Sequence, residues 1–139
     1  MFVHKSKIRI RYAETDQMGY VYYGNYATFF EVARVEALRS LNFSYNELEK
    51  SGIMLPVLEL QIKYVKPAFY DDEIVIETTI REIPKARIRF EYKTYNQKGD
   101  LLNFGNTALV FVDIKTKKPT HLLHQGNTGI TTNLSMLGG

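Results

Sequence analysis

The sequence predicts an α+β fold in which a mostly antiparallel sheet wraps around one long central helix. One segment near the N-terminus has apolar residues at helical spacing, and a series of later segments alternates apolar and polar residues with period two. The helical stripe is rich in aromatic side chains at its start, and such a stripe needs a broad apolar surface to cover it. A chain of 139 residues with 45% apolar content can bury one core of that kind.

The segment 6–13 is predicted to be the first strand, because isoleucines alternate there with lysine and arginine. A turn follows, and Asn25 then has the side chain of a helix N-cap, which predicts a helix over about 26–42. We expect the buried stripe of this helix to consist of Tyr26, Phe29, Phe30, Ala33, Ala37, Leu38 and Leu41.

A short helix over about 45–51 is predicted next, because Ser44 and Glu47 match the capping-box pattern and Gly52 is a natural stop. The pattern then changes to period two, which is typical of strands. The predicted strands are 58–64, 74–80, 88–94 and 102–115, with a glycine-containing turn over 97–100 before the last one. This order predicts an antiparallel meander whose long last strand would leave an exposed edge.

Composition and segment chemistry exclude several classes of protein. Cysteine is absent, which excludes disulfides, thiolate metal sites and thiol nucleophiles. The start of the chain lacks the apolar core of a signal peptide and no later apolar run could span a bilayer, so we expect a cytoplasmic protein without membrane insertion. The three histidines lie near the termini without metal-ligand spacing, so we expect no metal and no other cofactor. We expect one domain over 1–124 and a poorly ordered polar tail over 125–139.

The net charge of +3 is modest, and the basic residues mostly alternate with apolar ones along the predicted strands. The basic residues therefore lie on one face of the sheet. Two interpretations remain: an ordinary solvated face, or a face that attracts an anionic ligand such as a nucleotide-bearing cofactor. The sequence has neither dense basic clusters nor a nucleic-acid reading motif, so we expect no nucleic-acid partner. It also lacks a Gly-x-Ser-x-Gly elbow and a glycine-rich phosphate loop.

The turn that contains Asp16 and Gly19 is the strongest candidate for an active site. A helix N-terminus carries unpaired N–H groups and a partial positive charge, so a carboxylate beside one is placed to attack a polarised carbonyl. The alternative is a turn residue whose carboxylate only caps nearby N–H groups. Aromatic side chains around the turn could desolvate the carboxylate, which would make it a better base. They are Tyr20, Tyr22, Tyr23 and Tyr26.

The segment Glu14–Tyr26, which reads ETDQMGYVYYGNY, resembles the signature of the 4-hydroxybenzoyl-CoA thioesterase-like family of hotdog-fold acyl-CoA thioesterases. The resemblance continues through Phe30–Arg34 in the helix and in a later segment, Tyr64–Asp72. It covers roughly residues 6–122 and implies the hotdog fold, in which the sheet is the bun and the long helix the sausage.

The resemblance implies that Asp16 is the catalytic carboxylate, acting either as general base on water or as nucleophile. It also implies that the backbone N–H of Tyr23 polarises the thioester carbonyl. Two positions depart from the usual pattern, since Tyr20 stands where a smaller aliphatic residue is usual and Tyr23 where histidine is frequent. Every non-proline residue supplies an N–H, so the backbone donor is retained while the proton transfer that histidine could assist is not.

The resemblance places further residues at the substrate site, and those of the signature segment are Gly19, Tyr22, Gly24, Asn25 and Tyr26. Glu31 is a candidate supporting acid on the helix, or it pairs with Arg34 on the helix surface. Basic side chains would hold the nucleotide part of CoA. The alternative is that these side chains belong to a solvated face of the sheet and bind no ligand. The candidates are Lys66, Arg87 and Arg89. We expect surface or turn roles for Glu59, Asp71 and Asp72.

The expected function is hydrolysis of an acyl-CoA or acyl-carrier-protein thioester to a free acid and a thiol. The resemblance implies a homodimer or homotetramer with sites between subunits. One alternative is a noncatalytic acyl-thioester binding protein. Another is a hotdog hydratase or dehydratase, which would need a catalytic histidine that is absent near Asp16 and from the central helix.

Overall fold

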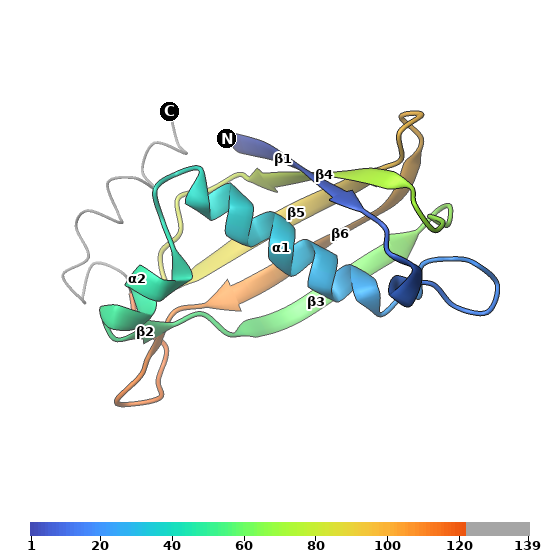
Figure 1. Cartoon of the computed structure of the whole chain (residues 1–139). Coiled ribbons are helices and arrows are strands. Elements are labelled where there is room, and N and C mark those ends of the chain that lie inside the picture. Colours follow the sequence, from blue (N-terminus) through green and yellow to red (C-terminus); the bar gives the residue numbers. More distant parts are fainter. Residues whose placement is uncertain (122–139) are drawn as a thin grey trace.

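The computed structural model of the chain describes residues 1–121, and the expected polar tail over 125–139 lies outside them. A five-stranded antiparallel sheet wraps around the long helix α1 (Figure 1), which confirms the α+β prediction. The helical elements are the 3₁₀ turn η1 (Tyr12–Glu14), α1 (Asn25–Arg39) and α2 (Tyr45–Lys50). The strands are β1 (Phe2–Arg9), β2 (Ile53–Met54), β3 (Val57–Tyr64), β4 (Glu73–Ile80), β5 (Arg87–Tyr95), β6 (Leu101–Val110) and β7 (Val112–Asp113).

The strand order of the large sheet is β1-β4-β5-β6-β3, so the predicted meander is correct only for β4, β5 and β6. The strand β3 does not pair with β4, the next strand of the sheet in sequence, but crosses to the far side and pairs with β6. The prediction that the last long strand leaves an exposed edge is therefore wrong, because β6 is paired on both sides. The two edges of this sheet are β1 and β3.

The predicted strand 102–115 also ends earlier than expected. β6 ends at Val110, and the two residues of β7 pair instead with β2 in a second small sheet. Asp113 then begins a tight turn, because its carboxylate accepts from the N–H groups of Lys115 and Thr116 at 2.8 and 3.0 Å. At the other end of the chain, β1 begins at Phe2 rather than residue 6, since its whole length pairs with β4.

The aromatic stripe of α1 faces the sheet, as its spacing predicts. Its buried residues include six of the seven expected, while Leu41 lies beyond the end of α1 and is partly buried. Phe30 stacks on Tyr92 of β5 with ring centroids 4.2 Å apart and an interplanar angle of 6°. This contact fixes α1 against the middle of the sheet.

The two helix starts differ in how they are capped. Ser44 caps α2 as expected, since its hydroxyl accepts from the Glu47 N–H at 3.1 Å. The prediction that Asn25 caps α1 is wrong, because Gly24 occupies the N-cap position and Asn25 is the first helical residue. The Asn25 side chain instead donates to the carbonyl of Glu14 at 2.8 Å, which joins the helix start to the loop before it.

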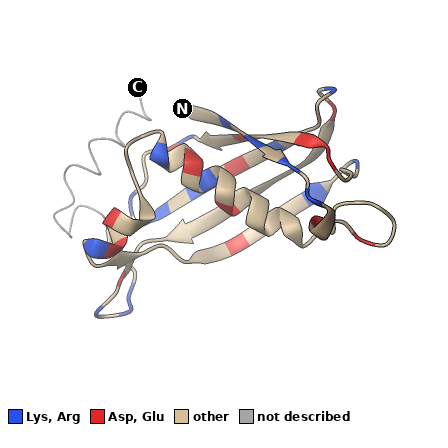
Figure 2. Ribbon diagram, in the orientation of Figure 1, with Lys and Arg blue, Asp and Glu red and all other residues tan. Residues whose placement is uncertain are grey.

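The strand β3 is the most exposed part of the sheet. The side chains of Leu58, Leu60 and Tyr64 are exposed to 51%, 39% and 47%. The reason is the position of α1, which lies closest to β1 and β4 and reaches β3 with its first turn, at Tyr64. Charged residues are spread along the sheet and over the far half of α1, whereas its first turns carry none (Figure 2). In the described part of the chain, no helix is long and apolar enough to cross a membrane.

Candidate active site

The Asp16 loop is a tight turn held by its own backbone. The Asp16 N–H donates to the Tyr20 carbonyl at 2.8 Å, and the Gly19 N–H donates to the Asp16 carbonyl at 3.0 Å. Gly19 has φ of +80°, a conformation in which a side chain would be strained, so the turn requires glycine there. The Asp16 carboxylate accepts through Oδ1 from the N–H groups of Met18 and Tyr20 at 2.9 and 3.1 Å. Among the described residues, no hydrogen bond reaches Oδ2.

Three contacts hold this loop against its surroundings. The Tyr22 N–H and the Asn25 side-chain amide both donate to the Glu14 carbonyl, at 2.9 and 2.8 Å. The Val21 N–H donates to the carbonyl of Ala68, at 2.8 Å, in the connection between β3 and β4. The carboxylate and the start of α1 are therefore tied to one framework.

The start of α1 leaves backbone donors unpaired. The Asn25 and Tyr26 N–H groups donate to the carbonyls of Tyr22 and Tyr23, at 3.0 and 3.2 Å. Among the described residues, neither the Tyr23 nor the Gly24 N–H has an acceptor. A side chain at Gly24 would meet the Tyr22 ring, because a Cβ there would lie 2.6 Å from its Cε2. Glycine thus keeps these donors accessible at the positive end of the helix dipole.

Asp16 and Tyr23 line the same hollow, which has a volume of about 400 Å³. Its remaining walls come from the Asp16 loop, the first turn of α1 and the end of β3. They are Tyr20, Val21, Tyr26, Tyr64, Val65, Lys66 and Pro67. Asp16 is the only carboxylate among these lining residues. The hollow therefore combines one acid, an open helix N-terminus and aromatic walls, which is the arrangement that acyl transfer needs.

Three tyrosines at or beside the hollow, Tyr22, Tyr26 and Tyr64, keep their protons at neutral pH. Burial raises the pKa of Tyr26 to about 12, with a further rise from Tyr64, while the Asn103 amide acts in the opposite direction. Burial, and then Tyr23, raise the pKa of Tyr64. A hydrogen bond with Tyr23 raises the pKa of Tyr22. These three side chains are therefore neutral hydroxyl groups at pH 7 rather than bases.

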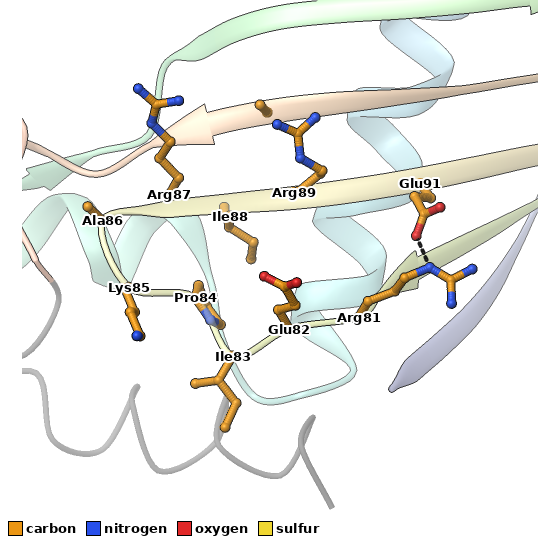
Figure 3. Close-up of a pocket in the computed structure, with 11 residues that line it drawn as sticks. Arg81, Glu82, Ile83, Pro84, Lys85, Ala86, Arg87, Ile88, Arg89 and Glu91 are labelled. Atoms are coloured by element: carbon orange, nitrogen blue, oxygen red, sulfur yellow. Dashed lines mark hydrogen bonds and ion pairs between the residues drawn. The ribbon is translucent and has the colours of Figure 1, made fainter.

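The basic residues expected at the substrate site are divided between two places. Lys66 lines the Asp16 hollow, with its Nζ 3.7 Å from an oxygen of Asp100. Arg87 and Arg89 lie on the sheet face away from α1, in a second hollow of about 510 Å³ (Figure 3). Arg89 is bound to Glu59 and Asn106, at 3.2 and 3.3 Å. Within one chain, neither arginine reaches the hollow that Asp16 lines.

Two further acidic groups, Glu31 and Asp72, do not line the Asp16 hollow in this chain. Glu31 is exposed on α1 and does not line the Asp16 hollow. Its alternative partner Arg34 is buried, and its Nε donates to the Tyr45 hydroxyl at 3.1 Å, so the two do not pair on the surface. Asp72 has the expected turn role, because its Oδ2 accepts from the Phe69 N–H at 2.9 Å.

Tyr64 is a site residue to which sequence reasoning assigned no role. It lines the hollow, and its hydroxyl donates to the Tyr23 carbonyl at 3.2 Å. Its ring also contacts those of Tyr23 and Tyr26, with centroids 6.3 and 5.8 Å away. The available signal was its place at the head of the second resembling segment. Tyr64 lies 41 positions from Tyr23 in sequence, so only the fold brings these two residues together.

The fold and the hollow together define an α+β protein in which one carboxylate and the open start of the long helix line the same hollow. The model of the thioesterase superfamily matches residues 18–103, a range that contains α1 and begins just after Asp16. This chain belongs to the thioesterase superfamily and is a thioesterase with the hotdog fold.

Curated relatives agree with this assignment. The chain is 38% identical over 119 residues to a putative acyl-CoA thioesterase, YneP, of Bacillus subtilis, with 86% of each protein covered. It is 33% identical over 115 residues to the acyl-CoA thioester hydrolase YbgC of Escherichia coli, covering 83% of this chain and 86% of that protein.

Solved structures show the same architecture. A DHNA-CoA thioesterase from Staphylococcus aureus superposes with a TM-score of 0.88 at 37% sequence identity, covering 99% of this chain and 93% of that one. A hypothetical protein from Thermus thermophilus, TT1821, superposes with a TM-score of 0.86 at 29% identity, covering 98% of both chains.

Proposed function

We propose that this protein hydrolyses acyl-CoA thioesters, with Asp16 as base or nucleophile and the Tyr23 N–H as the donor to the thioester carbonyl. The observation that carries the proposal is that this carboxylate and this unpaired N–H line one hollow. The names of the B. subtilis and E. coli relatives support acyl-CoA as the substrate.

The geometry of Asp16 supports a direct chemical role. Two N–H groups fix Oδ1, so the second oxygen is oriented and remains available to take a proton or to attack carbon. In the base route, Oδ2 removes a proton from water as the water oxygen bonds to the acyl carbon. In the nucleophile route, Oδ2 itself bonds to that carbon, and water then hydrolyses the anhydride. In both routes the C–S bond breaks and the thiolate leaves with the electron pair.

The donor end of α1 supports stabilisation of the negative oxygen that forms during either route. The N–H groups of Tyr23 and Gly24 are unpaired and lie at the positive end of a helix of 15 residues. A preorganised donor of this kind typically contributes about 10²–10³ in rate. Since a thiolate is a good leaving group, one carboxylate and one helix end suffice for the reaction.

The protein works as a homodimer in this proposal, joined through the β3 edges. β3 is eight residues long and presents apolar side chains to solvent, whereas the other edge, β1, carries Lys5, Lys7 and Arg9. A long apolar edge strand is a template for pairing with another chain, while lysines oppose it.

Antiparallel pairing of two β3 strands would also fix where the partner's Arg87 lies relative to the Asp16 hollow. The partner's Val57 would then lie beside the Tyr64 end of β3, which lines the Asp16 hollow. Arg87 pairs with Val110 and Val57 pairs with Leu109, so Arg87 is level with the Val57 end. The dimer would thus place the partner's Arg87 level with the Asp16 end, on the sheet face away from α1.

The test is thiol release from a panel of short, medium, long and aromatic acyl-CoAs by the parent protein and by Asp16→Asn. We expect the variant to lose a factor of about 10² or more in kcat/KM, because the amide neither accepts a proton nor attacks carbon. The matched control is Asp71→Asn, an exposed turn residue with φ of +67° where asparagine is tolerated. Equal rates for Asp16→Asn and the parent would contradict the role of Asp16. Binding of CoA esters without any turnover would instead support a noncatalytic binding protein.

A further inference from the structure

The side chain of Tyr64 joins the sheet to the start of α1. Its hydroxyl donates to the carbonyl of Tyr23 at 3.2 Å, and the same carbonyl accepts from the Tyr26 N–H at 3.2 Å. Among the described residues, the bond from Tyr64 is the only hydrogen bond between the Tyr23 backbone and a strand. Tyr23 is also the residue whose unpaired N–H lines up with the open end of the helix, so this bond reaches the proposed donor directly.

The backbone of Tyr64 is firmly held by the sheet. Tyr64 pairs with Asn103 of β6, and the next two residues, Val65 and Lys66, both donate to the Leu102 carbonyl, at 2.8 and 3.0 Å. The strand β6 is itself paired with β5 on its other side. A strand bonded in this way opens less easily than the first turn of a helix, which frays because its hydrogen bonds lie at the end of the ladder.

The Tyr64 ring is oriented by two neighbouring rings. It lies edge-on to the Tyr23 ring, with centroids 6.3 Å apart and an interplanar angle of 79°, and is tilted against the Tyr26 ring at 5.8 Å and 59°. Burial, and then Tyr23, raise the pKa of Tyr64, so the hydroxyl keeps its proton at neutral pH. A phenol has one proton to donate. Because the Tyr64 hydroxyl donates to a backbone oxygen, it has no second proton for the substrate.

Both peptide groups that meet at Tyr23 are held by hydrogen bonds. The peptide that carries the Tyr23 N–H has the Tyr22 oxygen at its other end, and this oxygen accepts from the Asn25 N–H at 3.0 Å. The next peptide has the Tyr23 oxygen and the Gly24 N–H. A peptide group is planar, so a bond that fixes its oxygen also fixes the direction of its N–H. The bond from Tyr64 therefore holds the helix start from outside the helix.

We propose that Tyr64 is a positioning residue that holds the Tyr23 backbone in place, so that the Tyr23 N–H meets the thioester carbonyl in the transition state. This inference rests on the proposed function and goes beyond it, because Tyr64 acts through Tyr23 rather than on the substrate. An oxyanion donor contributes fully only where it is fixed in advance. Displacement of a catalytic group by about 1 Å can cost about 10² in rate. The sheet supplies the rigidity that the first turn of α1 lacks by itself.

The test is Tyr64→Phe, which removes one oxygen atom and keeps the ring. We expect kcat for the best substrate of the acyl-CoA panel to fall by about tenfold, the effect of one hydrogen bond, with KM changed by less than about twofold. The matched control is Tyr70→Phe, the same change in a tyrosine that is 57% exposed and outside the hollow. It should change neither constant. Because both side chains are at least half-exposed or nearly so, each variant keeps the fold, and a thermal unfolding scan checks this.

Hydrogen exchange gives a second measurement that needs no turnover. The amides of Asn25 and Tyr26 donate to carbonyls three positions earlier, so their exchange rates report the opening of the first turn. We expect exchange at these two amides to be about tenfold faster in Tyr64→Phe than in the parent, because one hydrogen bond that holds the turn is lost. In Tyr70→Phe their exchange should match that of the parent.

Three results would overturn the role of Tyr64: a kcat in Tyr64→Phe equal to that of the control, a loss carried by KM, or unchanged exchange at the two amides. A loss carried by KM would show that the hydroxyl contacts the substrate directly. If no thioester of the panel releases thiol in the parent, the proposed function fails. Hydrogen exchange then decides by itself whether Tyr64 holds the helix start.

Discussion

At the scale of single residues, Asp16 has the turn role that was one of the two alternatives its sequence context offered, and this role is compatible with the other. Its Oδ1 has the structural role of a turn residue, because it accepts two backbone N–H groups. Its Oδ2 accepts no hydrogen bond from the described residues, as the proposed chemical role requires, and Asp16 lines the hollow. The turn role therefore serves the proposed chemical role, since the hydrogen bonds to one oxygen set the direction of the other.

The role of Asn25 in the structure differs from the role that the sequence predicts. Asparagine before an apolar helical stripe predicts an N-cap, but Gly24 is the N-cap and the Asn25 amide reaches the Glu14 carbonyl. Glu14 precedes Asp16 by two positions, so this hydrogen bond ties the carboxylate loop to the helix start. No local propensity rule could reveal the bond, because its acceptor is a backbone carbonyl 11 positions away.

We expect Asn25→Ala to lower kcat by about ten- to a hundredfold with little change in KM, because it releases the Asp16 loop from the donor end of α1. The free energy of unfolding should fall by only about 1 kcal/mol, the contribution of one hydrogen bond. Thiol-release kinetics and thermal unfolding measure the two effects. Asn46→Ala, an exposed asparagine on α2, is the matched control and should change neither. A loss of kcat no larger than in this control would show that the bond does not position the site.

At the scale of elements, the decisive feature is the crossing of β3 to the far edge of the sheet. The alternating pattern of residues 58–64 predicts a strand, and the structure confirms it. Strand order depends on connections rather than on periodicity, so the pattern could not show that β3 pairs with β6. The crossing has two consequences: it brings Tyr64 to the start of α1, and it leaves Leu58 and Leu60 exposed.

We expect Leu60→Lys to convert a β3-paired dimer into a monomer and to abolish most thiol release, because the lysine places a charge in the pairing face. Light scattering after size exclusion measures the mass, and the acyl-CoA panel measures the activity. Val3→Lys places the same charge on the other edge strand, β1, where the side chain is 43% exposed. It should keep both the dimer and the activity. A dimer that survives Leu60→Lys would contradict the β3 interface.

At the scale of the whole molecule, buried tyrosines link folding to alkaline pH. Burial is the largest cause that raises the pKa of both Tyr26 and Tyr92 to about 12. Their pKa in the unfolded chain is 10.0, so the folded state holds these protons more tightly. Their contribution to stability is therefore complete below pH 10 and disappears as the pH rises toward 12.

We expect the free energy of unfolding to fall between pH 10 and pH 12 by an amount on the order of a few kcal/mol. Urea unfolding at a series of pH values measures this slope. The double change Tyr26→Phe with Tyr92→Phe should flatten it, because the groups that titrate are removed. The exposed Tyr12, which is 77% exposed, supplies the control Tyr12→Phe, which should leave the slope unchanged. If the free energy of unfolding falls as steeply with pH in the double variant as in the parent, groups other than Tyr26 and Tyr92 cause the fall.

The sequence by itself determined the fold class, the aromatic stripe of α1, the capping of α2 by Ser44 and the candidate acid Asp16, because each depends on spacing or chemistry within a short segment. Only the tertiary structure decided which segments meet. It places Tyr64 against Tyr23, turns Arg34 into the core and separates Lys66 from Arg87 and Arg89. The physical reason is that strand order and the position of α1 over the sheet arise from contacts between segments far apart in the chain. A local sequence pattern therefore does not predict those contacts.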